Sequence, residues 1–392
     1  MSFLESTKKW TIWTLKSYWF FITLAIFVVI ARFAPNFARH GGLIRAEYTI
    51  GYAAVAVIFF GSGLSMGTKQ LMVNMANWRA HFTVLVLQFL ITPAIMYGFC
   101  CAIKAANNSK ISNWMLVGLI VTTSCPTTVA SNVVMTRQAD GNELLTLCEV
   151  FIGNLLGAFI TPALSQMFLT GTWAFGNPAN GSSIQRVYRD VMQQIGCSVF
   201  VPIFVGQVIQ NVFPKQTKWF LTTFRFNKVG SFMLLLVMFS SFSTAFYQHA
   251  FTAVSHESII LVCFFNVGIY LLFTVICFLL SRPFLLRKLP EPTNRGVYYY
   301  FYKTVAPFYL SRPDTVSMML CGAAKTAALG VSLVTAQYGN DFSHLGELLV
   351  PLVLYQSEQV LCAGLLTKLM KKWIHAEDKE KDSSADESTE KA

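Results

Sequence analysis

A chain of 392 residues with 54% hydrophobic and only 12% charged residues is unlike a typical soluble protein. Soluble domains carry roughly 25% charged residues, so this composition excludes a water-exposed surface over most of the chain and indicates contact with lipid. The formal net charge of +11 is expected to meet anionic lipid headgroups, and no nucleic-acid partner is expected.

Apolar runs long enough to cross a bilayer recur along the chain. A transmembrane helix needs about 20 mostly apolar residues. The first run is too long for a signal-peptide core, so we expect it to remain as a helix. The pattern predicts an all-α polytopic membrane protein with ten transmembrane helices. The runs cover residues 18–34, 47–66, 80–103, 113–136, 144–169, 191–213, 227–247, 256–281, 312–337 and 345–370.

The distribution of Lys and Arg predicts the orientation of these helices. Basic residues gather in the N-terminal segment 1–17, in the even-numbered connections and after the last run. Because cytoplasmic loops carry an excess of Lys and Arg, both termini are expected in the cytosol. Two N-x-S/T sequons, at Asn107 and Asn180, fall in connections that this topology places outside, the second of them within 172–190.

The last segment, 372–392, differs from the rest of the chain. It is rich in Glu, Asp, Lys, Ser and Thr, and it has almost no apolar side chains. Because such a segment cannot bury enough apolar surface to offset the entropy lost on folding, we expect a disordered acidic tail in the cytosol.

Two apolar runs contain stretches of small and polar residues that are expected to interrupt their helices. The stretch 122–132 in the fourth run contains Pro126, which removes a backbone donor, and the stretch 321–330 in the ninth run contains Gly322. Freed backbone groups cannot face lipid, so they must line a cavity or pack inside protein. Interrupted helices at corresponding places in two halves of a transporter indicate an inverted repeat with a binding site near the midplane.

Three polar residues in these stretches are candidates for that site: Ser131, Asn132 and Lys325. Polar groups at membrane depth are costly, which favours a binding role over a structural one. The alanines around Lys325, such as Ala323 and Ala327, are better explained by close packing of helices.

Short motifs along residues 18–370 carry a resemblance to a known family. The motifs lie at residues 34–36, 41–43, 59–64, 87–89 before Pro93, 126–132, 141–142, 159–163, 201–202, 206–207, 325–330 and 349–355. With them, the chain resembles the bile acid:sodium symporter family, in particular its divergent seventh-member branch and the fungal proteins of that branch.

The resemblance implies two inverted repeats of five helices, at 18–171 and 191–371, which form a core domain and a panel domain. It also implies that the discontinuous helices four and nine cross in the core, beside the cation sites of the sodium-coupled members. The positions that match cation ligands are Ser131 and Asn132 on helix four, Gln88 on helix three and the hydroxyl of Thr146 on helix five.

Helix nine departs from the pattern that the resemblance implies. The acidic ligand of the sodium-coupled members falls near Leu320, their glutamine falls at Ala324, and the next asparagine falls at Lys325. The carboxylate that would hold sodium is therefore missing, and a cationic side chain stands nearby. Two sodium ions and an ammonium group would repel one another strongly in a site of low dielectric constant, so ordinary two-sodium coupling is not expected.

Lys325, together with its neighbour Thr326, is expected to take the place of a bound cation. A buried ammonium needs a partner, and the candidates are first Glu149 in the fifth run and then Glu358 in the tenth. The alternatives are a structural ion pair without a role in transport, a contact with a substrate anion, or a proton that binds to and leaves Lys325 itself.

The resemblance implies a plasma-membrane carrier that restrains calcium entry, because eukaryotic members of this branch are linked to negative control of cytosolic calcium. Composition and spacing do not show this role, and they leave the transported solute or ion open. The alternatives are an organic-anion carrier, proton-coupled or uncoupled, and a scaffold that no longer transports but regulates a calcium channel. The sequence has no nucleophile–base pair and no metal-ligand spacing, so neither an enzyme nor a bound cofactor or metal is expected.

Overall fold

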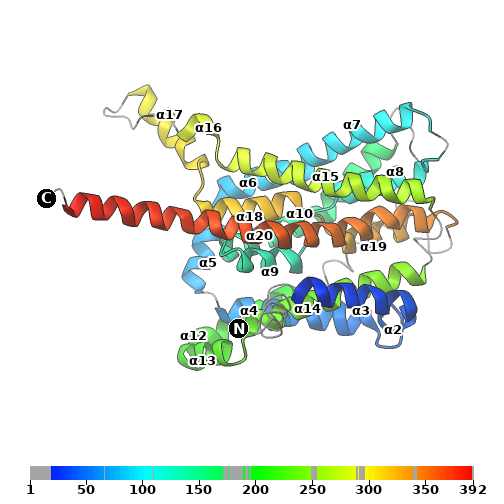
Figure 1. Cartoon of the computed structure of the whole chain (residues 1–392), viewed down its shortest axis with the longest axis horizontal. Helices are drawn as coiled ribbons and strands as arrows, with labels where there is room; N and C mark the ends of the chain where they lie inside the picture. The colour runs from blue at the N-terminus through cyan, green and yellow to red at the C-terminus, as the bar shows by residue number, and fades with distance from the viewer. Residues whose placement is uncertain are drawn as a thin grey trace, which may run out of the picture. The chain divides into compact units, whose positions relative to one another are not determined.

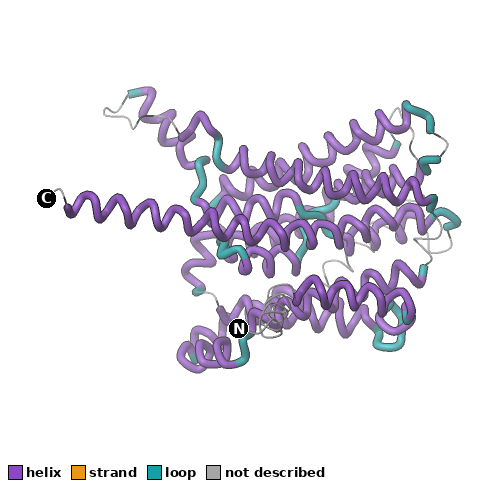
Figure 2. The backbone as a smooth tube through the Cα atoms, viewed as in Figure 1, coloured by secondary structure: helices purple, strands orange, loops and turns teal. Residues whose placement is uncertain are grey.

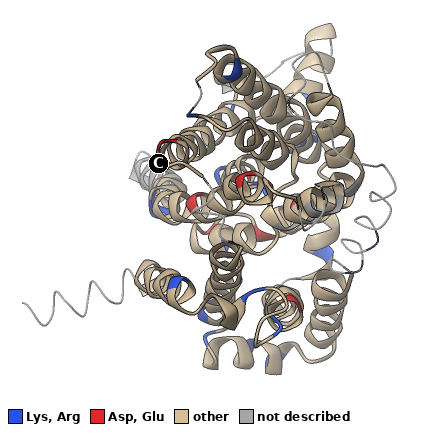
Figure 3. Ribbon diagram, turned by 90° about the vertical axis from the view of Figure 1, so that its right-hand side faces the viewer, with Lys and Arg blue, Asp and Glu red and all other residues tan. Residues whose placement is uncertain are grey.

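The computed structural model describes most of the chain as helix. The described residues are 19–65, 67–108, 110–170, 175, 189, 193, 196–248, 254–287, 290, 296–338 and 342–390. Within them the regular elements are helices, and Figure 2 shows no strand among the described residues. This confirms the predicted all-α class. Charged side chains are sparse along the ribbon in Figure 3, as the composition requires of a protein that faces lipid.

Several helices are long and apolar enough to cross a membrane. Five described helices pass by length and composition, and the number rises to seven if each of two bent pairs is one span. The chain is therefore a multi-pass membrane protein. The five are Ala46–Ser65, Trp78–Ala105, Lys228–Tyr247, His256–Ser281 and Leu345–Ala376; the bent pairs are Glu143–Gly157 with Phe159–Leu169 and Gly196–Val212 with Pro214–Thr223.

Three predicted spans are not among these helices. The described part of the first one is the short apolar helix Trp19–Phe33. The fourth and ninth are each divided into two short helices, so neither reaches the length of a full span. The total of ten membrane helices therefore stays a prediction.

The chain forms two compact units that alternate along the sequence. Unit 1 contains Met1–Ser65 and Gln193–Ala253, and unit 2 contains Met66–Met192 and Val254–Ala392. Each unit thus takes a segment from both of the predicted repeats, 18–171 and 191–371.

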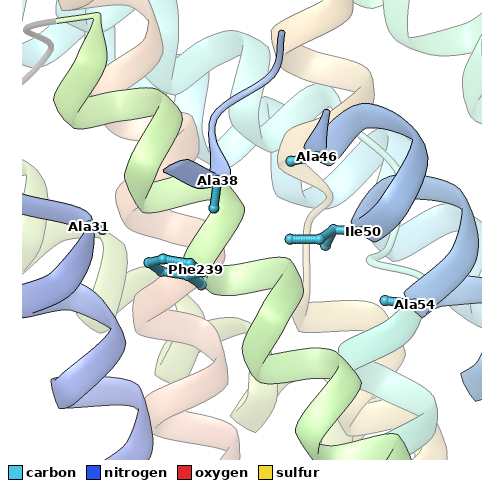
Figure 4. Packing of buried hydrophobic residues seen from close by; sticks show 6 residues of the cluster. All are labelled: Ala31, Ala38, Ala46, Ile50, Ala54 and Phe239. Atoms are coloured by element: carbon cyan, nitrogen blue, oxygen red, sulfur yellow. The ribbon is translucent and has the colours of Figure 1, made fainter. Parts of the chain in front are cut away.

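Unit 1 is held together by small residues where its helices meet. A Cβ added at Gly63 of α4 would lie 2.6 Å from the carbonyl oxygen of Ile203 in α12, so only glycine allows this close approach. Figure 4 shows a second contact, in which the aromatic ring of Phe239 packs among buried alanines and Ile50. Besides Trp19–Phe33, the elements are α2 Pro35–Ala38, α3 Ala46–Tyr48, η1 Thr49–Ala54, α4 Val55–Ser65, η4 Gly196–Phe200, α12 Val201–Val212, α13 Pro214–Thr223 and α14 Phe226–Tyr247.

Unit 2 contains both interrupted helices and the long C-terminal helix α20 (Figure 1). Its elements in chain order are α5 Thr68–Met75, α6 Trp78–Val86, η2 Leu87–Ile91, α7 Thr92–Ala105, α8 Asn113–Ser124, α9 Ala130–Gln138, α10 Glu143–Leu169, α15 His256–Ser281, α16 Phe284–Arg287, α17 Val297–Val305, η5 Ala306–Phe308, α18 Arg312–Ala323, α19 Ala327–Tyr338 and α20 Leu345–Glu390.

The two predicted helix breaks are present and touch each other. The first separates α8 from α9 at residues 125–129, around Pro126, and the second separates α18 from α19 at residues 324–326. The backbone N–H of Thr326 donates to the carbonyl oxygen of Pro126 at 2.8 Å, which joins the breaks directly. Each break therefore satisfies part of the backbone that the other exposes.

Gly322 does not lie in the second break, although the sequence suggested that it opens the helix. It is in the last turn of α18, and the break begins at Ala324. A Cβ on Gly322 would lie 2.5 Å from Cys277 Sγ in α15. The role of this glycine is therefore close packing of α18 against α15.

The C-terminal segment also differs from its expected form. The structure continues α20 through the acidic residues as far as Glu390, whereas the composition predicted a disordered tail from residue 372. Glu, Lys and Ala are good helix formers, so a helix that leaves the membrane is easily extended by such residues. The predicted N-terminal segment 1–17, Ser109 and nearly all of the connection 172–190 lie outside the described residues.

Candidate functional site

The side chain of Lys325 is the centre of the contact between the two breaks. It is 1% exposed, and its Nζ donates to the carbonyl oxygen of Gln88 at 2.8 Å and to that of Cys125 at 3.0 Å. The two carbonyls belong to different segments, one in η2 and one at the end of α8. One amine therefore joins three segments of the chain where the two breaks meet.

The carbonyl of Gln88 is available to Lys325 because of a local change in helix geometry. Residues Leu87–Ile91 form a π-helical turn, in which the N–H of Thr92 bonds to the carbonyl of Leu87, five residues earlier. In this register the donor to Gln88 would be residue 93, which is a proline and has no N–H. Short π-helical turns of this kind are frequent at functional sites.

The carbonyl of Cys125 is available because α8 ends at Ser124, just before Pro126. The backbone of Cys125 is extended, so the helical hydrogen bonding stops at this residue. The carbonyl end of a helix carries a partial negative charge, which favours a positive group at this position.

Three side chains of α20 hold the second break open. Gln359 bonds to both backbone groups of Lys325, accepting from its N–H at 2.8 Å and donating to its carbonyl at 2.8 Å. Gln356 accepts from the N–H of Ala327 at 3.2 Å, and the hydroxyl of Tyr355 donates to the carbonyl of Ala323 at 2.8 Å. The break is thus a defined conformation with its backbone groups satisfied inside the protein.

Side chains of α10 bond to the backbone of the first break and stabilise it. Asn154 donates to the carbonyl of Thr127 at 3.1 Å, and the hydroxyl of Thr161 donates to that of Ser124 at 2.9 Å. Between them, a Cβ on Gly157 would lie 2.5 Å from Pro126 Cγ, so the proline packs directly on the helix backbone. The fifth and tenth predicted spans therefore support the fourth and ninth in the same manner.

The polar residues predicted from helices four and five lie beside these breaks and are all buried. Ser131 donates to the hydroxyl of Thr128 at 3.0 Å, and Asn132 donates to the hydroxyl of Thr127. The hydroxyls of Thr146 and Thr136 are 3.0 Å apart. These side chains bond to one another within α9, α10 and the first break, rather than to Lys325.

Among the predicted residues, Gln88 bonds to Lys325, but through its backbone carbonyl and not through its side chain. Its side-chain amide donates to the carbonyl of Cys321 in α18 at 3.1 Å, while its Oε1 is buried and has no hydrogen-bond partner. An acceptor without a donor at this depth is unusual.

The predicted partner of Lys325 is wrong. Glu149 is hydrogen-bonded to His81 instead, with 2.7 Å between His81 Nδ1 and Glu149 Oε1. Within the described residues, no carboxylate, Glu358 included, lies within 4.0 Å of Lys325 Nζ. The partners of Lys325 are backbone carbonyl oxygens, in place of the acid that the sequence predicted.

Sequence reasoning did not single out His81, Gln356 or Gln359. A signal was present in each case. Gln356 and Gln359 are three residues apart in an apolar run, which places both on one helix face. His81 is seven residues before Gln88, again on one face.

The positions on helix nine at which the resemblance implied sodium ligands, Leu320 and Ala324, are buried and offer no polar side chain.

Known proteins of one family match nearly the whole length of the chain. The model of the SBF-like CPA transporter family matches residues 18–372. The chain is similar to "Solute carrier RCH1" of Candida albicans, with 63% identity over 95% of this chain and 93% of the relative, and to "Solute carrier RCH1" of Saccharomyces cerevisiae, with 60% identity over 95% and 86%. It is more distantly similar to "Sodium/bile acid cotransporter 7" of Mus musculus, with 26% identity over 92% and 94%.

These matches cover both helix breaks and every segment that contributes to the Lys325 site. The resemblance to the bile acid:sodium symporters, and to fungal proteins among them, is confirmed. The chain belongs to the SBF-like CPA transporter family.

Proposed function

We propose that this chain is a plasma-membrane solute carrier in which the ammonium group of Lys325 takes the place of a coupling cation, and that its activity restrains calcium entry. One observation carries the first part: Lys325 Nζ is enclosed at the helix crossing and donates to carbonyl oxygens of two other segments. Carbonyl oxygens are also the groups that coordinate sodium and potassium ions in membrane proteins.

Electrostatics supports an ammonium group in place of sodium. Two unit charges 4 Å apart repel by about 4 kcal/mol even at an effective dielectric constant of 20. A sodium ion beside Lys325 would need a carboxylate to offset this repulsion, and no described carboxylate lies within 4.0 Å of Nζ. The internal cation and a sodium ion therefore exclude each other at this site.

The same proposal includes ten membrane helices in two inverted repeats, with both termini in the cytosol. It is supported by the equivalent roles of α10 and α20, which supply side chains to the first and the second break. Because these helices follow the two interrupted ones in each half, the arrangement is what an inverted repeat produces.

The calcium role is carried to this chain from the family resemblance. The names of the relatives, solute carriers, support transport of a small solute. In this proposal, transport of that solute limits calcium influx indirectly. A scaffold that binds a calcium channel and an organic-anion carrier without effect on calcium are the alternatives that the following experiment separates.

Cells without this protein are expected to show a larger and longer cytosolic calcium rise after a pulse of external calcium than cells that contain it. A genetically encoded calcium reporter measures the rise, with wild type restored at known surface abundance. Equal rises in both cells would contradict the calcium role and favour the organic-anion carrier. Damping that survives loss of Lys325 would instead favour the scaffold.

A further inference from the structure

The side chains of His81 and Glu149 form a buried ionisable pair that has no part in the Lys325 site. His81 is 7% exposed and Glu149 is fully buried, and their side chains meet across α6 and α10 at 2.7 Å. Apart from His81, no charged side chain of the described residues lies within 4.0 Å of Glu149. The neighbouring titratable groups are the thiols of Cys148 on α10 and Cys321 on α18.

The hydrogen bonds determine how many protons the pair holds. His81 Nε2 lies 3.2 Å from the carbonyl oxygen of Met75, which can only accept, so Nε2 carries a hydrogen. The contact between His81 Nδ1 and Glu149 Oε1 then needs one further proton, because two acceptors do not approach to 2.7 Å. One proton therefore lies between the two side chains.

The other oxygen of Glu149 favours the neutral form of the pair. Oε2 is buried and has no hydrogen-bond partner. A buried carboxylate with one oxygen unpaired is much more costly than a neutral acid whose carbonyl is unpaired. Glu149 is therefore a carboxylic acid that donates to neutral His81, and loss of this proton leaves a net negative charge.

The pair lies between the end of α5 and the Lys325 site. Met75, which bonds to His81, is an exposed residue at the end of α5, next to the connection to α6. On the other side, Gly153 is one turn from Glu149 on α10, and a Cβ there would lie 3.0 Å from Gln88 Oε1. The backbone of Gln88 in turn accepts from Lys325.

We propose that the His81–Glu149 pair is the proton-binding site of this carrier, which binds one proton in its closed core and releases it when the core opens. Both ring nitrogens of His81 are bonded to protein, and Glu149 Oε2 is the one free ligand atom of the pair, so a proton fits this site and a metal ion does not. No covalent bond changes: the proton leaves Glu149 for water and returns from it. The inference rests on the proposed carrier function, because it names the coupling ion.

Infrared difference spectroscopy of the purified full-length chain between acidic and alkaline pH tests this site. Wild type is expected to show a carboxylic-acid C=O stretching band that is lost as the pH rises, and Glu149→Gln is expected to lack that band entirely. Glu257→Gln, which changes an exposed acid paired with Lys110, is expected to keep it. A spectrum without a Glu149 band, or with a band that no pH removes from the folded chain, would overturn the proposal.

A second variant keeps the test independent of how well Glu149→Gln folds. His81→Asn retains Glu149 but replaces the basic ring nitrogen with an amide, which can accept a hydrogen bond but is not a base, so the band is expected to persist to a different pH from that of wild type. An unchanged titration would show that His81 has no part in the site. Because neither solute nor calcium is present, a negative result leaves the carrier function standing, and a failed calcium assay leaves this site standing.

Discussion

Replacement of Lys325 by methionine is expected to abolish the damping of the cytosolic calcium rise. Methionine has a similar length but no donor, so the carbonyls of Gln88 and Cys125 lose the amine that joins them. Each buried acceptor left unpaired costs about 1–3 kcal/mol. Since 1.4 kcal/mol is about a tenfold change in an equilibrium constant, the equilibrium constant for assembly of this contact falls by about tenfold or more. The measurement is the calcium rise in cells that carry each variant at equal surface abundance.

The matched control is Lys110→Met, which removes the same charge from an exposed position. The Lys110 side chain is 65% exposed and pairs with Glu257 at 3.1 Å. Exposed ion pairs contribute little, about 0–1 kcal/mol, so this variant is expected to damp the calcium rise as wild type does. If Lys325→Met damped the rise as well as Lys110→Met, the crossing would have no part in the function.

Replacement of Gln359 by leucine is expected to destabilise the protein more than the same replacement of a buried glutamine away from the second break. Gln359 is the hydrogen-bond partner of both the N–H and the carbonyl of Lys325 at the second break. Leucine has a similar volume but cannot bond, so two backbone groups are left unpaired at membrane depth, at about 1–3 kcal/mol each. The expected result is a clear fall in the melting temperature of the purified chain, measured in one detergent.

Gln337→Leu on α19 is the control for this variant. Gln337 is also a buried glutamine of unit 2, but its Oε1 has no hydrogen-bond partner. Removing it breaks no bond at the second break, so the melting temperature is expected to change little. Equal effects of the two substitutions would mean that the break does not depend on α20.

The first helix break was predictable from the sequence because it has a local cause. Pro126 removes a backbone donor from its helix, and the structure places the first break at this residue. The position of the second break was less accurate, because small residues such as Gly322 permit an opening without requiring one. The side chains of Gln356 and Gln359 in α20, a helix far along the sequence, accept from the N–H groups of Lys325 and Ala327 and so stabilise the break at 324–326.

The partner of Lys325 was not predictable from the sequence. The rule that a buried ammonium needs a partner holds, but it does not say which kind. Glu149 is an acid in an apolar run and was therefore a candidate partner. Only the fold shows that it is hydrogen-bonded to His81 instead. The true partners are backbone carbonyls, which every residue has. Only the π-helical turn and Pro93 make that of Gln88 available.

Sodium binding by the purified wild-type chain tests most directly the claim that Lys325 takes the place of a coupling cation. The melting temperature is measured in sodium chloride and in potassium chloride at equal ionic strength. A ligand that binds the folded state at 100 times its Kd adds about 2.7 kcal/mol of stability. The account predicts the same melting temperature in both salts at every concentration. A rise that is specific to sodium would show that the chain still binds the ion that Lys325 is proposed to replace, and it would contradict this claim.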